Sequence, residues 1–400
     1  GQGSTFTSTG TINAADGTAI YVQAEKGKTT SNNSIALAAG STTTGDIFIK
    51  GGDGNKVSNT VLTIGEGAVF DGSIEVQGAT DTKITANTTF KGRSGSFGAA
   101  IFLNDPTAQV DLSGSNFIGN VAQAKDKTTG GAGAIYSYAK TLTQKGGSYV
   151  NNQALSQGYN NGTIQDGALG GALVIKGNSI TMTDVLFQGN SATATKTDKT
   201  VGGYAYGGAI AVDYSTGYGD GTGQNRTADL TVNITQDMTY SGNTVSSDST
   251  GTHFDTFGYH VLTAAAGGFL FLDRGSSADF NVSAGATLTI GSTVTTDDTD
   301  SIASSIPDAG TKTNSGRDAL IKKTGNGTLV LNSSLNKYYG DLQVNAGRME
   351  VNSQWSLKSL VTVEGGTLAL AGFNFEQSDA EKRDTEINDG KITVTSGGLE

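Results

Sequence analysis

The sequence contains no cysteine and only two prolines among its 400 residues. The absence of cysteine excludes disulfide bonds, thiol catalysis and cysteine-ligated metal sites. It also suits a chain that crosses an oxidising compartment before it folds. No run of 18 apolar residues is present, so we expect no membrane-spanning helix. Because the sequence shows neither an initiator methionine nor a signal peptide, we expect it to be a segment of a longer protein.

Basic residues are scarce relative to acidic ones. The chain has 26 Lys and Arg residues against 37 Asp and Glu residues, which gives a formal net charge of −11. Such a charge disfavours a general binder of nucleic acids or anionic membranes. We therefore expect no nucleic-acid partner.

Glycine is abundant, with 59 residues. A disordered glycine-rich chain normally has more proline and fewer Val, Ile, Leu and Phe residues. Short runs that alternate apolar with polar residues, such as Ile180–Thr183 and Leu230–Ile234, predict strands. We therefore interpret the glycines as turn residues of an ordered all-β protein.

A repeat organises the middle of the chain. An aromatic-x-x-Asn unit begins at Phe117, Tyr149, Phe187 and Tyr240, and Arg93 replaces the Asn of a partial copy. Each unit is followed by a strand opening rich in glycine and alanine. The spacing from an opening to the next aromatic is nearly constant, apart from one insertion, whereas the spacing from an aromatic to the next opening grows along the chain.

Strands that superpose must keep their lengths, whereas loops at one corner can lengthen freely. The repeat therefore predicts a right-handed parallel β-helix, a solenoid with three strands in each turn. We expect the aromatic residues to stack in its core. We expect the Asn residues to form a hydrogen-bonded ladder at a turn, where Asn tolerates left-handed backbone geometry.

The pattern divides the chain into two regions. Residues 1–275 are predicted to form a β-helix with long loops on one face, over residues 117–266. Residues 276–400 are predicted to add further rungs, interrupted by a long polar loop at Ser292–Gly316.

The second region carries three specific motifs. They are Lys-Thr-Gly-x-Gly-Thr-Leu-x-Leu from Lys323, a Tyr-x-Gly turn that ends at Gly340, and Val-x-x-Gly-x-x-x-Val from Val344. Over Gly316–Leu370 this block resembles the passenger-associated transport repeat of type V autotransporters. The repeats of residues 90–272 resemble those of chlamydial polymorphic outer-membrane proteins and enterobacterial autotransporters. Among such passengers, the chain is most similar to an adhesin of uropathogenic bacteria.

The resemblance implies a place and a role. Passengers of this family are carried by a C-terminal translocator barrel, which this sequence lacks, to the bacterial cell surface or into the medium. The implied partners are host glycosaminoglycans or another polysaccharide, and a host matrix protein such as fibronectin. The implied role is adhesion.

The long loops are the expected site of polysaccharide binding. Val121–Gly131, Gln153–Ala168, Ser191–Tyr206 and Thr244–Ala266 should leave the same edge of the stack and wall a groove. The insertion Asp213–Ala228 should leave elsewhere. The loops contain the groups that polysaccharide recognition uses. Aromatic rings stack on sugars, amides and carboxylates bind hydroxyls, and cations meet sulfates. The candidate ligand-binding residues are Lys125, Asp126, Lys127, Tyr159, Asn160, Lys196, Asp198, Lys199, Tyr204, Tyr206, Tyr218 and Arg226.

Three alternatives remain open. In the first, these loops are ordinary solvated segments whose tyrosines pin them to the rod. In the second, the protein self-associates through an outward face of Asn, Asp and Thr on the short-looped rungs (residues 45–110). In the third, it is a polysaccharide lyase or hydrolase, in which Asp111 and Asp184 approach each other across rungs.

We do not expect an enzyme. The only two histidines, His253 and His260, lie in one loop with no nucleophile motif nearby. We therefore predict no catalytic residues, no metal site and no cofactor.

Overall fold

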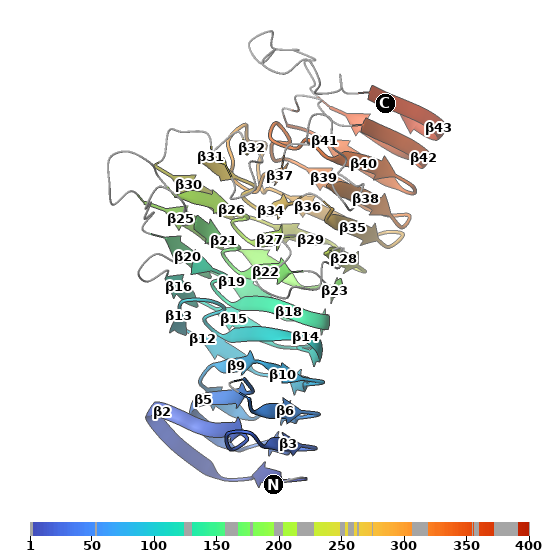
Figure 1. Cartoon of the computed structure of the whole chain (residues 1–400). Coiled ribbons are helices and arrows are strands. Elements are labelled where there is room, and N and C mark those ends of the chain that lie inside the picture. Colours follow the sequence, from blue (N-terminus) through green and yellow to red (C-terminus); the bar gives the residue numbers. More distant parts are fainter. Residues whose placement is uncertain are drawn as a thin grey trace.

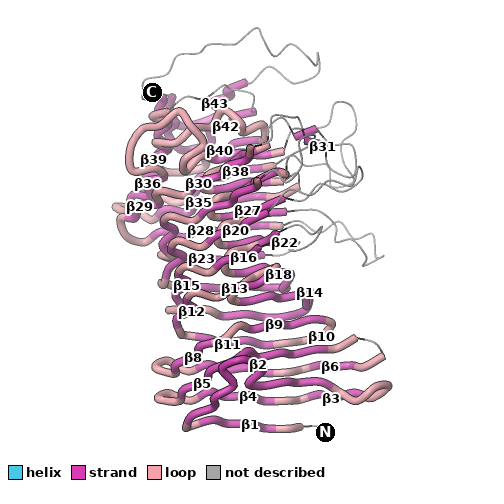
Figure 2. Tube along the Cα trace, turned by 90° about the vertical axis from the view of Figure 1, so that its left-hand side faces the viewer, coloured by secondary structure: helices cyan, strands magenta, loops and turns pink. Residues whose placement is uncertain are grey.

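The computed structural model shows strands that pile up in rungs along one axis (Figures 1 and 2). Every regular element in its described residues is a strand. Pairings between the strands are parallel, except between the short β31 (His253–Phe254) and β32 (His260–Val261). This arrangement confirms the predicted class, an all-β parallel β-helix. The described residues are 3–52, 54–123, 130–156, 167–176, 179–195, 203–213, 228–248, 253–254, 260–261, 264–273, 275–305, 319–353, 355, 360–371 and 391–399.

Three long stacks of strands form the rod. The first consists of β1 (Thr5–Ser8), β4 (Ser34–Leu37), β7 (Val61–Ile64), β11 (Lys83–Ala86), the second halves of β14 (Ile101–Asp111) and β18 (Ile135–Lys145), β23 (Ser179–Thr183), β28 (Asp229–Ile234), β35 (Ser277–Val282), β38 (Leu320–Thr324), β40 (Asp341–Val344), β42 (Leu360–Leu370) and β43 (Lys391–Leu399). The second consists of β2 (Thr11–Gln23), β5 (Thr42–Lys50), β9 (Ile74–Gln77), the first halves of β14 and β18, β22 (Leu173–Lys176), β27 (Ile210–Asp213), β34 (Leu270–Leu272) and β37 (Ile302–Ser304). The third begins with the first halves of β2 and β5 and ends with the second halves of β42 and β43. Between them it consists of β8 (Val69–Asp71), β12 (Thr89–Lys91), β15 (Asn116–Ile118), β19 (Ser148–Val150), β24 (Leu186–Gln188), β29 (Met238–Tyr240), β36 (Thr287–Ile290), β39 (Thr328–Leu331) and β41 (Arg348–Val351).

Shorter stacks complete the rungs. The fourth consists of β13 (Ser94–Gly95), β16 (Val121–Gln123), β20 (Gln153–Ser156), β25 (Ser191–Ala194) and β30 (Thr244–Ser247). The fifth consists of β17 (Gly130–Gly131), β21 (Gly167–Leu169), β26 (Tyr204–Tyr206) and β33 (Ala265–Ala266). A sixth, near the N-terminus, consists of β3 (Thr29–Ser31), β6 (Lys56–Ser58) and β10 (Ala79–Thr80).

One expectation about strands is wrong. The stretch Ser292–Gly316 is predicted to be loop, yet Ile302–Ser304 forms β37 and pairs in parallel with β34. Ile302 is buried in the core, and this burial stabilises the strand. The surrounding polar residues hide the short apolar segment in the sequence.

The predicted aromatic stacking is confirmed. The core aromatic column consists of Phe90, Phe117, Tyr149, Phe187 and Tyr240, which are all fully buried. From Phe90 to Phe187, successive ring centroids lie 5.0, 4.8 and 4.9 Å apart with nearly parallel planes. Tyr240 ends the column with its ring turned, 5.5 Å from Phe187 at 80°. Each contact adds ring–ring attraction to the burial of apolar area.

The predicted asparagine ladder is also confirmed. The side-chain amide of Asn120 donates to the Oδ1 atom of Asn152 (2.8 Å), Asn152 donates to Asn190 (3.0 Å) and Asn190 to Asn243 (3.0 Å). Asn243 in turn donates to the buried carboxylate of Asp300 (2.9 Å). We call these five residues the amide ladder. At its other end, the backbone N–H of Arg93 donates to Asn120 (2.9 Å).

We expected left-handed backbone geometry at the ladder asparagines themselves. For all four, the residue just before the asparagine has it instead. Positive φ angles occur at Gly119, Asn151, Gly189 and Gly242, and only Asp300 of the ladder has one itself. The preceding residue makes the turn. The following Asn can therefore keep an ordinary backbone while its side chain points into the rod.

The Gly-Gly-Ala openings form a second tight corner. A Cβ atom added to Gly171 would lie 1.9 Å from the carbonyl oxygen of Gly208, and one added to Gly133 would lie 2.0 Å from that of Gly171. Backbones of successive rungs thus approach more closely here than any side chain allows.

A lysine is buried in the C-terminal rungs. Lys323 points inward from β38, and its Nζ atom donates to the carbonyl oxygens of Thr324 (2.7 Å), Gly325 (2.8 Å) and Ala346 (3.2 Å). Burial lowers the pKa of Lys323 to about 8, an effect that the charge of Asp279 partly opposes.

The amide ladder yields a stability prediction. Asn152→Ala removes two donors and an acceptor from buried partners, so we expect it to lower the free energy of unfolding by roughly 3 kcal/mol. Asn151→Gly is the matched control, because this exposed residue has a φ of 55° and should change stability by less than about 0.5 kcal/mol. Denaturant unfolding followed by circular dichroism measures both. Equal midpoints for Asn152→Ala and the wild type would contradict the ladder's role.

The buried lysine yields a pH prediction. The folded state holds the Lys323 proton less tightly than the unfolded state, whose pKa is about 10.4. The free energy of unfolding should therefore rise between pH 8 and pH 10.5, because the unfolded chain binds more protons than the folded chain in that interval. Relative to Lys323→Met, the wild type should gain roughly 1–3 kcal/mol over that interval. If the free energies of unfolding of the wild type and of Lys323→Met change in parallel with pH, the pKa of Lys323 is not lowered.

Candidate functional site

The bases of the long loops lie in register. Near the starts of the loops, Gln123 pairs with Leu155, Leu155 with Thr193 and Thr193 with Ser246 in the fourth stack. The chain re-enters the rod in the fifth stack, where Gly167 pairs with Tyr204. The four loops thus bridge the same two stacks on successive rungs. We call this region the loop edge.

The insertion Asp213–Ala228 leaves the rod at a different point from the four loops, as predicted. It follows β27 and precedes β28, and so it connects the second stack to the first rather than the fourth to the fifth.

Two of the candidate ligand-binding residues, Tyr204 and Tyr206, lie in the described part of the loop edge. Their ring centroids are 5.0 Å apart, and Tyr206 stacks on Phe271 at 4.5 Å. Tyr206 is only 4% exposed, whereas Tyr204 is half-buried. The packing of Tyr206 fits the alternative in which tyrosines anchor the loops. The other candidates lie outside the described residues: Lys125, Asp126, Lys127, Tyr159, Asn160, Lys196, Asp198, Lys199, Tyr218 and Arg226.

The outer side of the second stack carries aromatic residues that the sequence interpretation missed. Tyr21, Phe48, Glu75, Phe102 and Tyr136 occupy one register position on five successive rungs. We call these five residues the aromatic strip. Each follows the inward Ile of its strand, so the recurring Ile-aromatic pair was the available signal. The strip is interrupted by Glu75 and it ends where smaller residues take over.

Exposure differs along this register position. Tyr21 is 50% exposed and the other strip residues are half-buried. On the following rungs, Val174 and Ala211 are fully buried and Phe271 is 6% exposed. The accessible part of this outer side therefore lies on the rungs from Tyr21 to Tyr136.

The outer side of the first stack is polar. One register position runs from rung to rung over most of the rod, and we call it the polar face. It is occupied by Thr63, Thr85, Asp111, Thr143, Thr181, Thr231, Asp279, Lys322, Gln343 and Thr362. The face predicted for residues 45–110 thus extends far beyond them.

The carboxylates expected for a hydrolase are not in register. Asp111 aligns with Thr143 and then with Thr181, so Asp184 lies two rungs away and three residues further along. Asp111 accepts hydrogen bonds from Ser113, and Asp184 accepts them from Thr235. In the described part of the chain, no three His, Cys, Asp or Glu residues gather in a way that could hold a metal ion.

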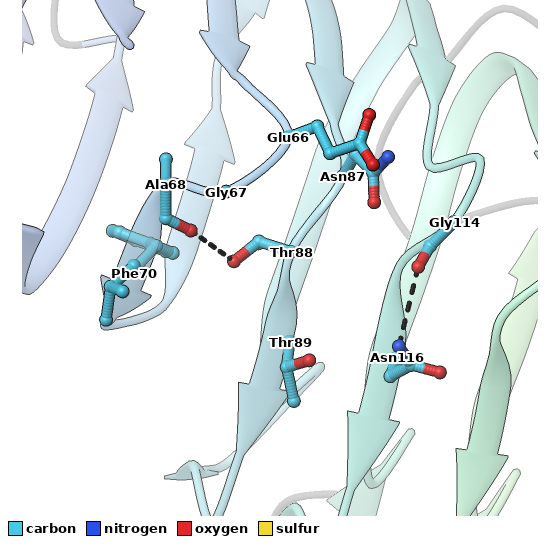
Figure 3. Close-up of a pocket in the computed structure, with 10 residues that line it drawn as sticks. Glu66, Gly67, Ala68, Phe70, Asn87, Thr88, Thr89, Gly114 and Asn116 are labelled. Atoms are coloured by element: carbon cyan, nitrogen blue, oxygen red, sulfur yellow. Dashed lines mark hydrogen bonds between the residues drawn. The ribbon is translucent and has the colours of Figure 1, made fainter. Parts of the chain in front are cut away.

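A pocket of about 330 Å³ lies at the corner between the first and third stacks (Figure 3). Its polar groups are partly engaged with nearby backbone. Thr88 donates to the carbonyl oxygen of Ala68 (3.2 Å) and Asn116 to that of Gly114 (3.4 Å). Glu66 is the one carboxylate among its lining residues, so the pocket holds no acid–base pair.

Comparison with known proteins gives one informative likeness. The chain is 28% identical over 323 residues to a protein described as the probable autotransporter YfaL of Escherichia coli (strain K12). The alignment covers 74% of this chain and 23% of that relative, so the chain spans about a quarter of the relative's length. No family profile and no solved structure matches. The likeness supports the resemblance to an autotransporter passenger. Within the described residues, no helix is long and apolar enough to cross a membrane.

Proposed function

We propose that this chain is the passenger part of an autotransporter and acts as an adhesin at the bacterial surface or after release into the medium. The likeness to an autotransporter and the parallel rungs support the first half of the proposal. The single observation that carries the second half is the register of the loop edge. It brings the bases of four long loops side by side on one rigid scaffold.

The proposed ligand of the loop edge is a host glycosaminoglycan or another polysaccharide. An extended chain molecule laid along the rod would meet one loop after another, because successive rungs are only about 4.8 Å apart. The lysines of these loops would meet sulfates, and tyrosines and asparagine would bind sugar rings and hydroxyls. Tyr218 and Arg226 lie in the insertion that leaves the rod elsewhere, so they are not part of this site. We propose that a matrix protein such as fibronectin binds a strand face of the rod instead. The proposed function involves no catalysis.

A second candidate function is self-association of passengers on neighbouring cells, which would cause clumping and biofilm growth. The polar face favours it. Rows of Thr, Asp and Gln on a regular sheet surface can hydrogen-bond to the same rows on a second rod aligned beside it. Clumping of cells that display the chain, without binding to any polysaccharide, would select this candidate.

The loop edge is tested by replacing residues 157–166 and 196–202 with short turns. These segments lie between β20 and β21 and between β25 and β26, so the strands of the rod are retained. We expect heparin binding to weaken at least roughly tenfold, because Lys196 and Lys199, two of the cations proposed to meet sulfates, are removed together with Tyr159 and Asn160. The wild-type affinity should fall steeply with added salt.

Two comparisons make this test specific. Shortening residues 214–227, which leave the rod at another corner, should not change heparin binding. Binding of the matrix protein should survive trimming of the loop edge. If heparin binds the trimmed protein as tightly as the wild type, the loop edge is not the polysaccharide site.

A further inference from the structure

The aromatic strip has a spacing that suits repeating sugar units. The rings of Tyr21 and Phe48 lie 6.0 Å apart, and those of Phe102 and Tyr136 lie 5.4 Å apart. Phe97 adds a ring 5.7 Å from Tyr136. Neighbouring rings belong to adjacent rungs, which repeat at about 4.8 Å. This repeat is close to the length of one sugar unit in an extended polysaccharide, so successive sugars would meet successive rings within each pair, and the sugar between the pairs would meet Glu75.

Amide side chains flank the strip. Gln23, Gln77 and Asn104 lie two residues after strip positions on the same strands, and therefore on the same side of the sheet. Gln23 and Gln77 are exposed and Asn104 is half-buried. An amide both donates and accepts hydrogen bonds, as a sugar hydroxyl does. The strip thus combines apolar ring faces with groups that match hydroxyls.

The cations beside the strip are engaged within it. Lys50, two residues after Phe48, forms an ion pair with Glu75 (3.0 Å), and its Nζ atom lies 5.4 Å from the centre of the Phe48 ring. At the other end of the strip, the Nζ atom of Lys176 lies 5.7 Å from the centre of the Tyr136 ring. Glu75 also interrupts the apolar surface that a protein partner would bury at the centre of an interface. The chemistry therefore favours an uncharged chain of sugars.

We propose that the aromatic strip and its flanking amides form a second binding site, specific for a neutral linear polysaccharide that lies along the rod axis. Sugar rings stack on Phe48, Phe102 and Tyr136, and their hydroxyls bond to Gln77 and Asn104. The site runs from the short-looped rungs to Tyr136, just after the first long loop, over the part of the second stack whose outer side is accessible. It does not rest on the proposed function of the loop edge.

The test uses the whole 400-residue chain in affinity electrophoresis through gels that contain hydroxyethylcellulose, xylan or galactomannan, with heparin in a parallel gel. We expect at least one neutral polysaccharide to retard the wild type, with little change on adding salt. The triple variant Phe48→Thr, Phe102→Thr, Tyr136→Thr should bind roughly tenfold more weakly or not at all, because three stacking contacts are lost. Threonine preserves strand propensity at these outward positions.

Control variants separate this site from the others. Thr63→Ala, Thr85→Ala, Thr143→Ala changes the polar face of nearby rungs and should leave retardation unchanged, as should trimming of the loop edge. The double variant Gln77→Ala, Asn104→Ala leaves the rings in place and should weaken binding severalfold. Thermal unfolding shows whether each variant is folded.

Three results would overturn the proposal. The first is that none of the neutral polysaccharides retards the wild type. The second is that a folded triple variant is retarded as strongly as the wild type. The third is that neither the wild type nor any variant binds a neutral polysaccharide, while the triple variant loses binding of a matrix protein. That result would make the strip a protein-docking surface. Loss of heparin binding on loop trimming bears only on the loop edge.

Discussion

Register between rungs is the constraint on which the rest of this structure depends. Each rung must place an aromatic ring over the ring of the rung before it and an amide where the previous amide can donate to it. Beside the amide ladder, only glycine lets the backbones come close enough, as Gly171 and Gly208 show. These requirements act together because the buried amides would be costly if any rung slipped by one residue. A rod without cysteine is thus held by repetition of a few local contacts.

The same constraint decides where the chain is free to vary. Strand lengths are fixed by the neighbours above and below, but the passage from the fourth to the fifth stack is not. Long loops can therefore gather at one edge while the polar face and the aromatic strip stay short and regular. The outcome is a scaffold whose sides differ in chemistry: a loop edge, a face of Thr and Asp, and a strip of rings. Each side suits a different kind of partner, which fits a molecule that works by contact.

The sequence was informative wherever a residue type repeats. Phe117, Tyr149 and Asn190 recur at matched positions, so their stacking followed from spacing alone. β37 was missed because Ile302 stands almost alone among polar residues. The aromatic strip was missed for a related reason: Glu75 interrupts it, and outward positions are not held by core packing. Sequence reasoning placed the site on the loops, where only Tyr204 and Tyr206 fall within the described residues, and there Tyr206 is buried against Phe271.

The amide ladder also has a direction. Each bond between its side chains runs from an amide to the next rung toward the C-terminus, while the second N–H of Asn120, Asn152 and Asn190 donates to a backbone carbonyl of the preceding rung. The row ends on Asp300, a carboxylate that accepts from the Asn243 side chain and from the backbone of Gly242 and Asn243. Burial raises the pKa of Asp300, while these donors lower it in part. A line of aligned dipoles therefore points its positive end at a buried acid, as a helix N-terminus does for an anion. Because such a field falls off within about one turn, the amides nearest Asp300 supply most of it, so the neighbouring rungs are coupled to this acid through electrostatics as well as through packing.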